Sequence, residues 1–311
     1  MARKLTVSLV PNALTAPLLD GEAGIDGVEI DPVRADRVDA NTRAMMRLEF
    51  DIAEMSLATY VKLREDGAPL VGLPIFTGRR FCEPGIGVRK GAGIQSPGQL
   101  AGRRVGFPQF WMTSSVWHRA VLSAVYGVPA EAVRWVSVQA ERFDDRVPAG
   151  GVAFEYRLGG SVPAMLEAGE LDAVVFPRPV AERFDAAHVA CLFAEVAAAQ
   201  RGFLSRTGLF PIMHFVVAQQ PVLSANPGLA EAMLETFEQI KARFLRLPDR
   251  ASAMESPIFG MGFEDALDDF GGDAWPYGLE ANAAVLAWFL DQAHRQGLTR
   301  TRLAPHTLFA A

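Results

Sequence analysis

The sequence predicts an α/β protein of about two domains, and two observations lead to that prediction. Short runs rich in β-branched and apolar residues alternate along the chain with segments whose apolar positions follow helical spacing. The chain has 311 residues, of which 50% are hydrophobic and 21% charged. That length and composition suit a soluble protein with sizeable cores and about two domains. Alternation of strands and helices is typical of an α/β fold.

The first 92 residues contain the elements expected of a first lobe. A helix is expected to start near Asn41, and another covers residues 57–64. The strands are expected at residues 5–10, 28–33, 50–53 and 70–76. Residues 86–89 follow and are predicted to form a crossover strand.

Residues 93–207 are predicted to form the second lobe. Ser96 caps a short helix that Gly102 stops, and a strand follows at residues 103–107. A longer helix starts at Thr113 and ends at Gly127. After this helix, the sequence predicts a strand at 133–138, a helix at 161–167 and a strand at 171–176. The return crossing is placed between residues 191 and 217.

Residues 208–311 are predicted to rejoin residues 1–92 in the first lobe. One long helix is capped by Asn226 with Pro227 in its first turn, and a second spans residues 279–296 before Gly297. Two crossings would then join the lobes around a central cleft. Strand ends and helix N-termini border such a cleft, so backbone N–H groups there favour an anion.

Composition excludes several classes of protein. A formal net charge of −6 argues against a general nucleic-acid binder, although a local basic pocket is compatible with it. Cys82 and Cys191 belong to no CxxC pair or zinc-like cluster, so we expect free thiols and no structural zinc. Without a glycine-rich nucleotide loop of the usual spacing, no organic cofactor is expected.

The N-terminal segment MARKLTVSLV alternates apolar and polar residues as a strand does and lacks the apolar core of a signal peptide. No run reaches the roughly 18 apolar residues of a membrane span. We therefore expect a cytoplasmic protein without a membrane partner. Its oligomeric state is left open by the sequence, a homo-oligomer included.

Three separated segments carry a resemblance to a known family. They are FDIAEMSLATY at residues 50–60, FPIMHFV at 210–216 and WPYGLEAN at 275–282. The chain resembles the 4,5-dihydroxyphthalate decarboxylases from residue 5 to residue 309. That family removes carbon dioxide from an aromatic dicarboxylate and is built like a two-lobed, type-2 periplasmic binding protein. The resemblance implies this fold, with a small aromatic carboxylate in the central cleft.

Decarboxylation of an arene leaves negative charge on a ring carbon, so the site needs cations for the remaining carboxylate and a proton donor. His214, flanked by apolar residues, is the preferred general acid. The alternative is a buried histidine bonded to a carbonyl near the hinge. Glu54 would tune His214 or accept hydrogen bonds from ring hydroxyls; alternatively it caps the helix that begins near Leu57.

Arginines that follow strands are the candidate substrate anchors. Arg178 comes just after the strand at 171–176, where it could grip a carboxylate with two hydrogen bonds, and the family has a Pro-Arg pair here. A solvated arginine in a proline-stiffened loop is the alternative. Arg79 and Arg80 follow the strand that ends at Phe76, and Arg79 is the better match to the family.

Polar and aromatic side chains complete the predicted site. Glu54 and Ser56 in the first lobe and residues 112–114 in the second are expected to form opposing lips of the cleft. Ser56, Thr113 and Ser114 would contact the substrate there, and Thr113 and Ser114 can bind a carboxylate or simply cap a helix. Trp117 is favoured over His118 as the residue that faces the pocket. Tyr277, with Trp275, would form an aromatic wall against a planar substrate, unless both are packing residues.

The sequence also departs from the family pattern. Cys82 and Glu83 stand where the family has an Arg-His pair, and Gln109 replaces a glutamate. Two other functions therefore stay open beside the decarboxylase. One is a non-catalytic binding protein for a small organic acid. The other is a metal-assisted lyase in which Glu54 and His214 share a divalent ion, although no linear ligand motif supports it.

Overall fold

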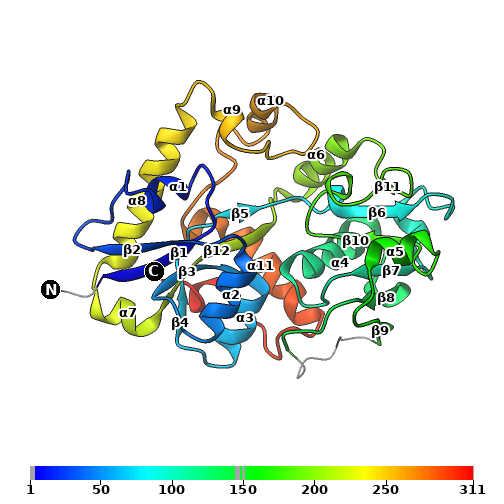
Figure 1. The fold of residues 1–311 in the computed structure, drawn as a ribbon, viewed down its shortest axis with the longest axis horizontal. Coiled ribbons are helices and arrows are strands. Elements are labelled where there is room, and N and C mark those ends of the chain that lie inside the picture. The colour runs from blue at the N-terminus through cyan, green and yellow to red at the C-terminus, as the bar shows by residue number, and fades with distance from the viewer. Residues whose placement is uncertain (1–3, 144–147, 149–150, 311) are drawn as a thin grey trace.

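The computed structural model describes residues 4–143, 148 and 151–310, and these form two lobes (Figure 1). Each lobe is built on a six-stranded mixed sheet. The strand order is β2-β1-β3-β12-β4 in the first sheet, with β5 also paired to β12, and β11-β6-β10-β7-β8-β9 in the second. The predicted α/β fold with two lobes is confirmed.

The first sheet combines three parallel strands with a long antiparallel strand. β1 lies parallel to both β2 and β3, whereas β12 runs antiparallel to β3, β4 and β5. The strands are β1 (Leu5–Leu9), β2 (Ile30–Arg34), β3 (Ile52–Ser56), β4 (Leu70–Gly72), β5 (Gly78–Arg79) and β12 (Ile212–Gln219).

Helices flank this sheet in the order that the sequence predicts. The expected helices near 41 and 57 are α2 and α3, and the two long C-terminal helices are α8 and α11. α8 begins after Gly228, whose φ is 84°, rather than at the predicted cap Asn226. The helices are α1 (Ala16–Leu19), α2 (Val38–Met46), α3 (Leu57–Glu65), α7 (Gln220–Ala225), α8 (Leu229–Leu245), α9 (Arg250–Ala253), α10 (Phe263–Asp268) and α11 (Leu279–Arg295).

In the second sheet, β10, β7, β8 and β9 are parallel neighbours, and β6 runs antiparallel to β10 and β11. The helix that starts at Thr113 ends as predicted, with Gly127 at a φ of 68°. The strands are β6 (Ile86–Arg89), β7 (Arg104–Phe107), β8 (Arg134–Ser137), β9 (Phe154–Tyr156), β10 (Ala173–Val175) and β11 (Val189–Cys191); the helices are α4 (Thr113–Tyr126), α5 (Val162–Glu167) and α6 (Val196–Thr207).

The boundary between the lobes differs from the predicted one at residue 92. β6 belongs to the second sheet, so the chain leaves the first sheet after β5 and crosses before Ile86. A short segment with β-branched residues such as Ile86 and Val88 indicates a strand but does not reveal which sheet it joins. The return crossing lies between β11 and β12, within the predicted interval, and it contains α6.

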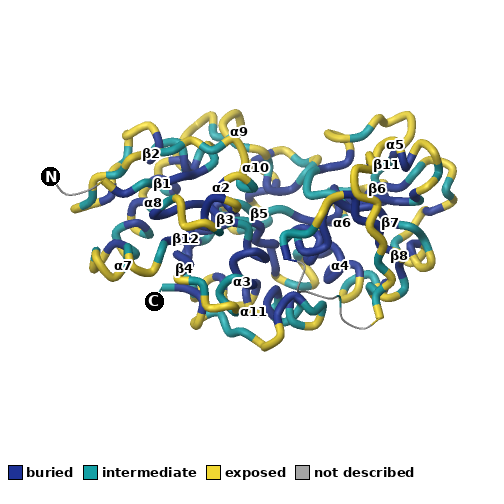
Figure 2. The backbone as a smooth tube through the Cα atoms, turned by 60° about the horizontal axis from the view of Figure 1, so that its bottom comes forward, coloured by how far each residue is buried: buried dark blue, intermediate teal, exposed yellow. Residues whose placement is uncertain are grey.

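One side of the junction between the lobes is packed like a protein core. Trp117 of α4 stacks on Trp288 of α11, with ring centroids 4.9 Å apart and planes 14° apart, and its Nε1 donates to the Ile212 carbonyl at 2.9 Å. Arg119 Nε donates to Gln296 Oε1 at 2.9 Å. Figure 2 shows buried backbone running from the central strands of the first lobe into α4.

Within the described residues, no helix is long and apolar enough to cross a membrane.

Candidate functional site

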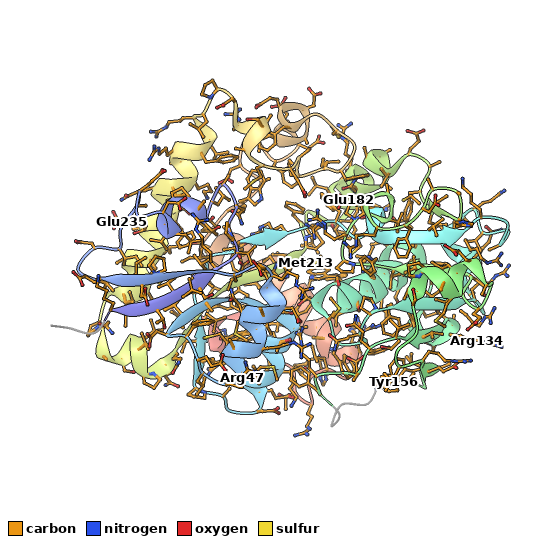
Figure 3. All side chains as sticks on the ribbon, viewed as in Figure 1. Arg47, Arg134, Tyr156, Glu182, Met213 and Glu235 are labelled. Atoms are coloured by element: carbon orange, nitrogen blue, oxygen red, sulfur yellow. The ribbon has the colours of Figure 1, made fainter. Side chains whose placement is uncertain are left out.

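A pocket lies between the lobes on the other side of this junction. The first lobe contributes residues from α2, the end of β3, the residue after β5, and the start of β12. The second lobe contributes the N-terminus of α4 and the segments after β8 and β10. Its lining residues are Val38, Asp39, Ser56, Arg80, Met112, Thr113, Ser114, Arg142, Pro177, Met213 and His214. Figure 3 places Met213 between the lobes, near the middle of the molecule.

Strand pairing brings Glu54 and His214 together. In the β3–β12 ladder, His214 lies opposite Ser56 and Val216 lies opposite Glu54. Because residues two apart on a strand share a face, these side chains lie on one face of the sheet. His214 Nδ1 is 3.7 Å from Glu54 Oε1, and the His214 side chain is 33% exposed whereas that of Glu54 is 3% exposed. His214 therefore forms the pocket wall, with Glu54 behind it.

Burial controls the protonation of this pair. Burial raises the pKa of Glu54 to about 7, although its oxygens accept hydrogen bonds from Thr77 Oγ1 at 2.7 Å and from the Val10 amide at 3.0 Å. Burial also lowers the pKa of His214, and the charges of Arg80 and Arg142 lower it further. At neutral pH, His214 is thus uncharged and Glu54 is near its protonation midpoint.

Two adjacent arginines have opposite surroundings. Arg80 lines the pocket, where its Nη1 donates to the Pro177 carbonyl at 3.0 Å, and no described carboxylate forms an ion pair with it. Arg79 is turned into the first lobe. It donates to the carbonyls of Phe210 and Pro276, each at 3.1 Å, and to Asn282 Oδ1.

The predicted anchor Arg79 therefore lies outside the pocket lining, and Arg80 is the cation at the pocket wall. Consecutive residues of an extended segment point to opposite sides, so only one of the two arginines can face the pocket. The sequence showed the pair but not which of its members points there.

Arg142 is a pocket cation that sequence reasoning missed. It follows β8 and reaches back to the first lobe, where its Nη1 donates to Thr59 Oγ1 at 3.0 Å and its Nη2 pairs with Asp39. Its local signal was only a basic residue in a polar connection after a predicted strand. The contact with Asp39 joins residues about a hundred positions apart and depends on how the lobes meet.

The predicted opposing lips do meet. Ser56 Oγ lies 2.8 Å from Thr113 Oγ1, and the same oxygen of Thr113 accepts the Ala58 amide at 2.9 Å. Thr113 and Ser114 occupy the first turn of α4, so their N–H groups lie at a helix N-terminus on the pocket wall. The binding role of these three residues stays a prediction.

Three other predicted site residues lie elsewhere. Arg178 pairs with Glu182 at 2.9 Å and with Glu255 at 3.2 Å, and its side chain is 41% exposed. It therefore fits the alternative of a solvated loop arginine. The residue before it, Pro177, lines the pocket instead.

Trp117 and Tyr277 are packing residues instead of pocket walls. Trp117 is fully buried in the α4–α11 contact. Tyr277 is buried in the first lobe, with Lys241 Nζ 4.6 Å from its ring centroid. His118 is also buried, and its ring nitrogens lie near the carbonyls of Ser114 and Cys82. Aromatic residues beside a glycine or on a helix face do not reveal whether they face a cleft or a core.

The departures from the family pattern lie outside the pocket lining. Glu83 is buried and accepts a hydrogen bond from the Tyr126 hydroxyl at 3.0 Å, and Cys82 beside it is a buried free thiol. Gln109 donates to the Ala140 carbonyl. The pocket keeps two cations, Arg80 and Arg142, so these departures do not leave it without a partner for an acid.

Among the described residues, no group of three or more His, Cys, Asp or Glu side chains is arranged to hold a metal ion. Glu54 and His214 are two candidate ligands, and Glu54 already accepts hydrogen bonds at both oxygens.

Comparison with known proteins identifies the family. The chain is 34% identical over 304 residues to a 4,5-dihydroxyphthalate decarboxylase of Comamonas testosteroni, covering 94% of this chain and 92% of that protein. It belongs to the 4,5-dihydroxyphthalate decarboxylase family. A protein of the same description from Pseudomonas putida is 34% identical over 169 residues, covering 52% of this chain and 66% of that protein. The family resemblance read from the sequence is confirmed.

Solved structures place this decarboxylase-family member in the periplasmic-binding-protein fold. The family model for the periplasmic substrate-binding protein of phosphonate ABC transporters matches residues 16–269. The aliphatic sulphonate binding protein of Escherichia coli superposes with a TM-score of 0.60 at 16% identity, covering 99% of this chain and 98% of that one. The alkanesulfonate-binding protein of Xanthomonas axonopodis pv. citri gives 0.56 at 14% identity, with the same coverage. These neighbours confirm the fold.

Proposed function

We propose that this protein decarboxylates a hydroxylated aromatic carboxylate, 4,5-dihydroxyphthalate to protocatechuate or a related acid. The observation that carries the proposal is the His214 ring at the pocket wall, with the buried carboxyl of Glu54 3.7 Å behind it. Arg80, without a carboxylate partner in the described structure, supplies a cation for the acid. The names of two relatives support the reaction.

The pocket offers different surroundings to the group that stays and the group that leaves. Arg80 can hold the retained carboxylate with two hydrogen bonds. Met112, Pro177 and Met213 give the pocket an apolar portion, where a second carboxylate loses hydration. Loss of hydration raises the energy of a carboxylate more than that of neutral carbon dioxide, so it favours bond cleavage.

Protonation completes the reaction. As the carbon–carbon bond breaks, its electron pair stays on the ring carbon and carbon dioxide leaves. His214 donates a proton from Nε2 to that carbon and accepts one at Nδ1 from Glu54, which the solvent then reprotonates. The 3.7 Å separation from Glu54 must shorten for this transfer, as catalytic hydrogen bonds often do when substrate binds.

The test is to incubate the purified protein with 4,5-dihydroxyphthalate and related aromatic acids, following carbon dioxide release and ligand-induced melting shifts together. His214→Asn is expected to lower kcat by about 100-fold or more while the melting shift persists. His188→Asn, at an exposed position outside the pocket lining, is the matched control and should turn over normally. Normal turnover by His214→Asn would remove its central role.

The second candidate is a non-catalytic binding protein for a small organic acid, which the fold neighbours favour. It would give melting shifts with the same acids but no carbon dioxide from any of them. Because both functions use Arg80, only product formation separates them.

A further inference from the structure

We propose that Arg142 binds a second acidic group of the substrate, and that Asp39 forms an ion pair with the Arg142 guanidinium until that group binds. This inference rests on the proposed function to the extent that an aromatic acid enters this pocket. It adds a specificity residue, Arg142, and a placeholder carboxylate, Asp39.

Arg142 has the surroundings of a binding cation. Its side chain is only 11% exposed, and it shares the pocket lining with Arg80 and His214. Its Nη1 donates to Thr59, its Nη2 pairs with Asp39, and its buried Nε has no hydrogen-bond partner. A guanidinium so far removed from water is stabilised by an anionic partner. In this structure, Asp39 is that partner.

If its ion pair with Arg142 breaks, the negative charge of Asp39 is still stabilised by other groups. Its Oδ2 accepts a hydrogen bond from Arg43 Nε at 2.9 Å, one turn along α2, whereas Oδ1 faces Arg142. The Asp39 side chain is 40% exposed and lies in the first turn of α2, where the helix dipole stabilises a negative charge. Solvent, Arg43 and the dipole therefore remain when the guanidinium turns to a ligand.

Two pocket cations with unequal availability predict a preference among acids. Arg80 forms no ion pair with a described carboxylate, so a single carboxylate binds there without displacing another. The second carboxylate, which is the one that leaves in the proposed reaction, gains Arg142 but must displace Asp39. This contact adds affinity and selectivity and offsets part of the desolvation by Met112, Pro177 and Met213. The affinity for a diacid thus depends on Arg142 and is lowered by competition with Asp39. The affinity for a monoacid depends on neither residue.

The experiment measures the affinity of the full chain for 4,5-dihydroxyphthalate and for 3,4-dihydroxybenzoate by calorimetry, with every variant made in the His214→Asn background so that the diacid is not consumed during the titration. Arg142→Gln should weaken binding of the diacid by about 10- to 100-fold and change that of the monoacid by less than about threefold. Asp39→Asn should tighten binding of the diacid by about fivefold or more, and by a larger factor than the monoacid. In the double variant, the Asp39 substitution should have no further effect on the diacid.

Asp291→Asn is the matched control. Asp291 bridges two arginines as Asp39 does, Arg295 at 2.6 Å and Arg302 at 2.9 Å, but lies outside the pocket lining. It should leave both affinities unchanged. Arg142→Lys, which keeps the charge, should recover part of the diacid affinity, which separates binding from a loss of folding.

Equal weakening of both acids by Arg142→Gln would overturn the inference, as would unchanged or weaker diacid binding in Asp39→Asn. Neither result depends on turnover, so the inference is separable from the proposed function. If no acid binds to the wild-type chain, the proposed function fails as well. If acids bind and are decarboxylated but Arg142→Gln affects both acids equally, only the inference fails.

Discussion

The two sides of the lobe junction differ in what holds them together. Where α4 meets α11, Trp117 stacks on the partly buried Trp288, and Trp117 belongs to the same buried core cluster as Phe215 of the first lobe and Phe107 of the second. Around the pocket, the lobes meet through hydroxyls and charges: Ser56 with Thr113, Arg142 with Asp39, and Arg178 with Glu255. The first side is mainly aromatic packing, with the Arg119–Gln296 hydrogen bond beside it, and the second consists of hydroxyl and charged contacts at the pocket.

This difference separates stability from chemistry. Apolar packing has few alternative partners, so we expect the α4–α11 side to set the angle between the lobes. Polar groups at the pocket can exchange one partner for another at a modest free-energy cost. A site that is positioned before the substrate arrives suits catalysis by preorganised charges.

The largest expected effect comes from breaking the packed side. Trp117→Ala should reduce the free energy of unfolding by about 3–5 kcal/mol, because it leaves a cavity beside Trp288 and the Ile212 carbonyl without its donor. Urea denaturation measures this. Trp117→Phe should cost less, because it keeps the stack. A loss below about 1 kcal/mol would show that this side does not hold the lobes.

The adjacent arginines test the polar side against the interior. Arg80→Gln should weaken acid binding by about 10- to 100-fold with little change in stability, because it removes the cation at the pocket wall. Arg79→Gln should instead destabilise the fold by about 2–3 kcal/mol, because it removes the donor for buried carbonyls. Calorimetry measures the affinity and urea denaturation the stability of both variants. If Arg79→Gln weakened binding and Arg80→Gln lowered stability instead, Arg79 would be the pocket cation.

The pH dependence tests the Glu54–His214 pair. The pKa of Glu54 is about 7, so the rate constant for decarboxylation should fall above that pH, approaching tenfold per unit, as the proton is lost. Glu54→Gln should be slower and lack this decline. A wild-type rate that stays constant from pH 6 to 9 would exclude Glu54 as the proton source.

The same raised pKa has a consequence for stability. Between the ordinary pKa of the carboxyl, 4.5, and about 7, the folded state binds more protons at Glu54 than the unfolded state. The stabilisation from that proton is present below 4.5 and is lost as the pH rises through 7. Glu54→Gln should therefore gain stability relative to the wild type between pH 5 and 8, which denaturation at several pH values measures.

The smallest effect on binding and stability is expected at Arg178, outside the pocket lining. Arg178 forms exposed ion pairs with Glu182 and Glu255, and such pairs contribute about 0–1 kcal/mol. Arg178→Gln should leave the KM for the acid and the melting temperature nearly unchanged in the same assays. A large rise in KM would restore the original prediction that Arg178 holds the substrate.

Several parts of the site could be predicted from the sequence, because their signals are local. His214 and Glu54 lie in segments that resemble the family, and strand and helix periodicity places Ser56, Thr113 and Ser114 at element ends. Those five residues meet where β3, β12 and α4 approach one another.

Other parts were decided by the tertiary structure alone. Whether Arg79 or Arg80 faces the pocket depends on the direction in which the segment after β5 leaves the sheet. Whether Trp117 and Tyr277 line a cleft or a core depends on what packs against them.

The sequence by itself determined the α/β class, the order of the main elements, the family and the acid–base candidates, because each follows from local patterns of side chains. Only the tertiary structure decided that Arg80 and Arg142 are the pocket cations and that Asp39 pairs with one of them. The physical reason is that a cation's role depends on which anions surround it. In this protein those neighbours come from different lobes, far apart along the chain.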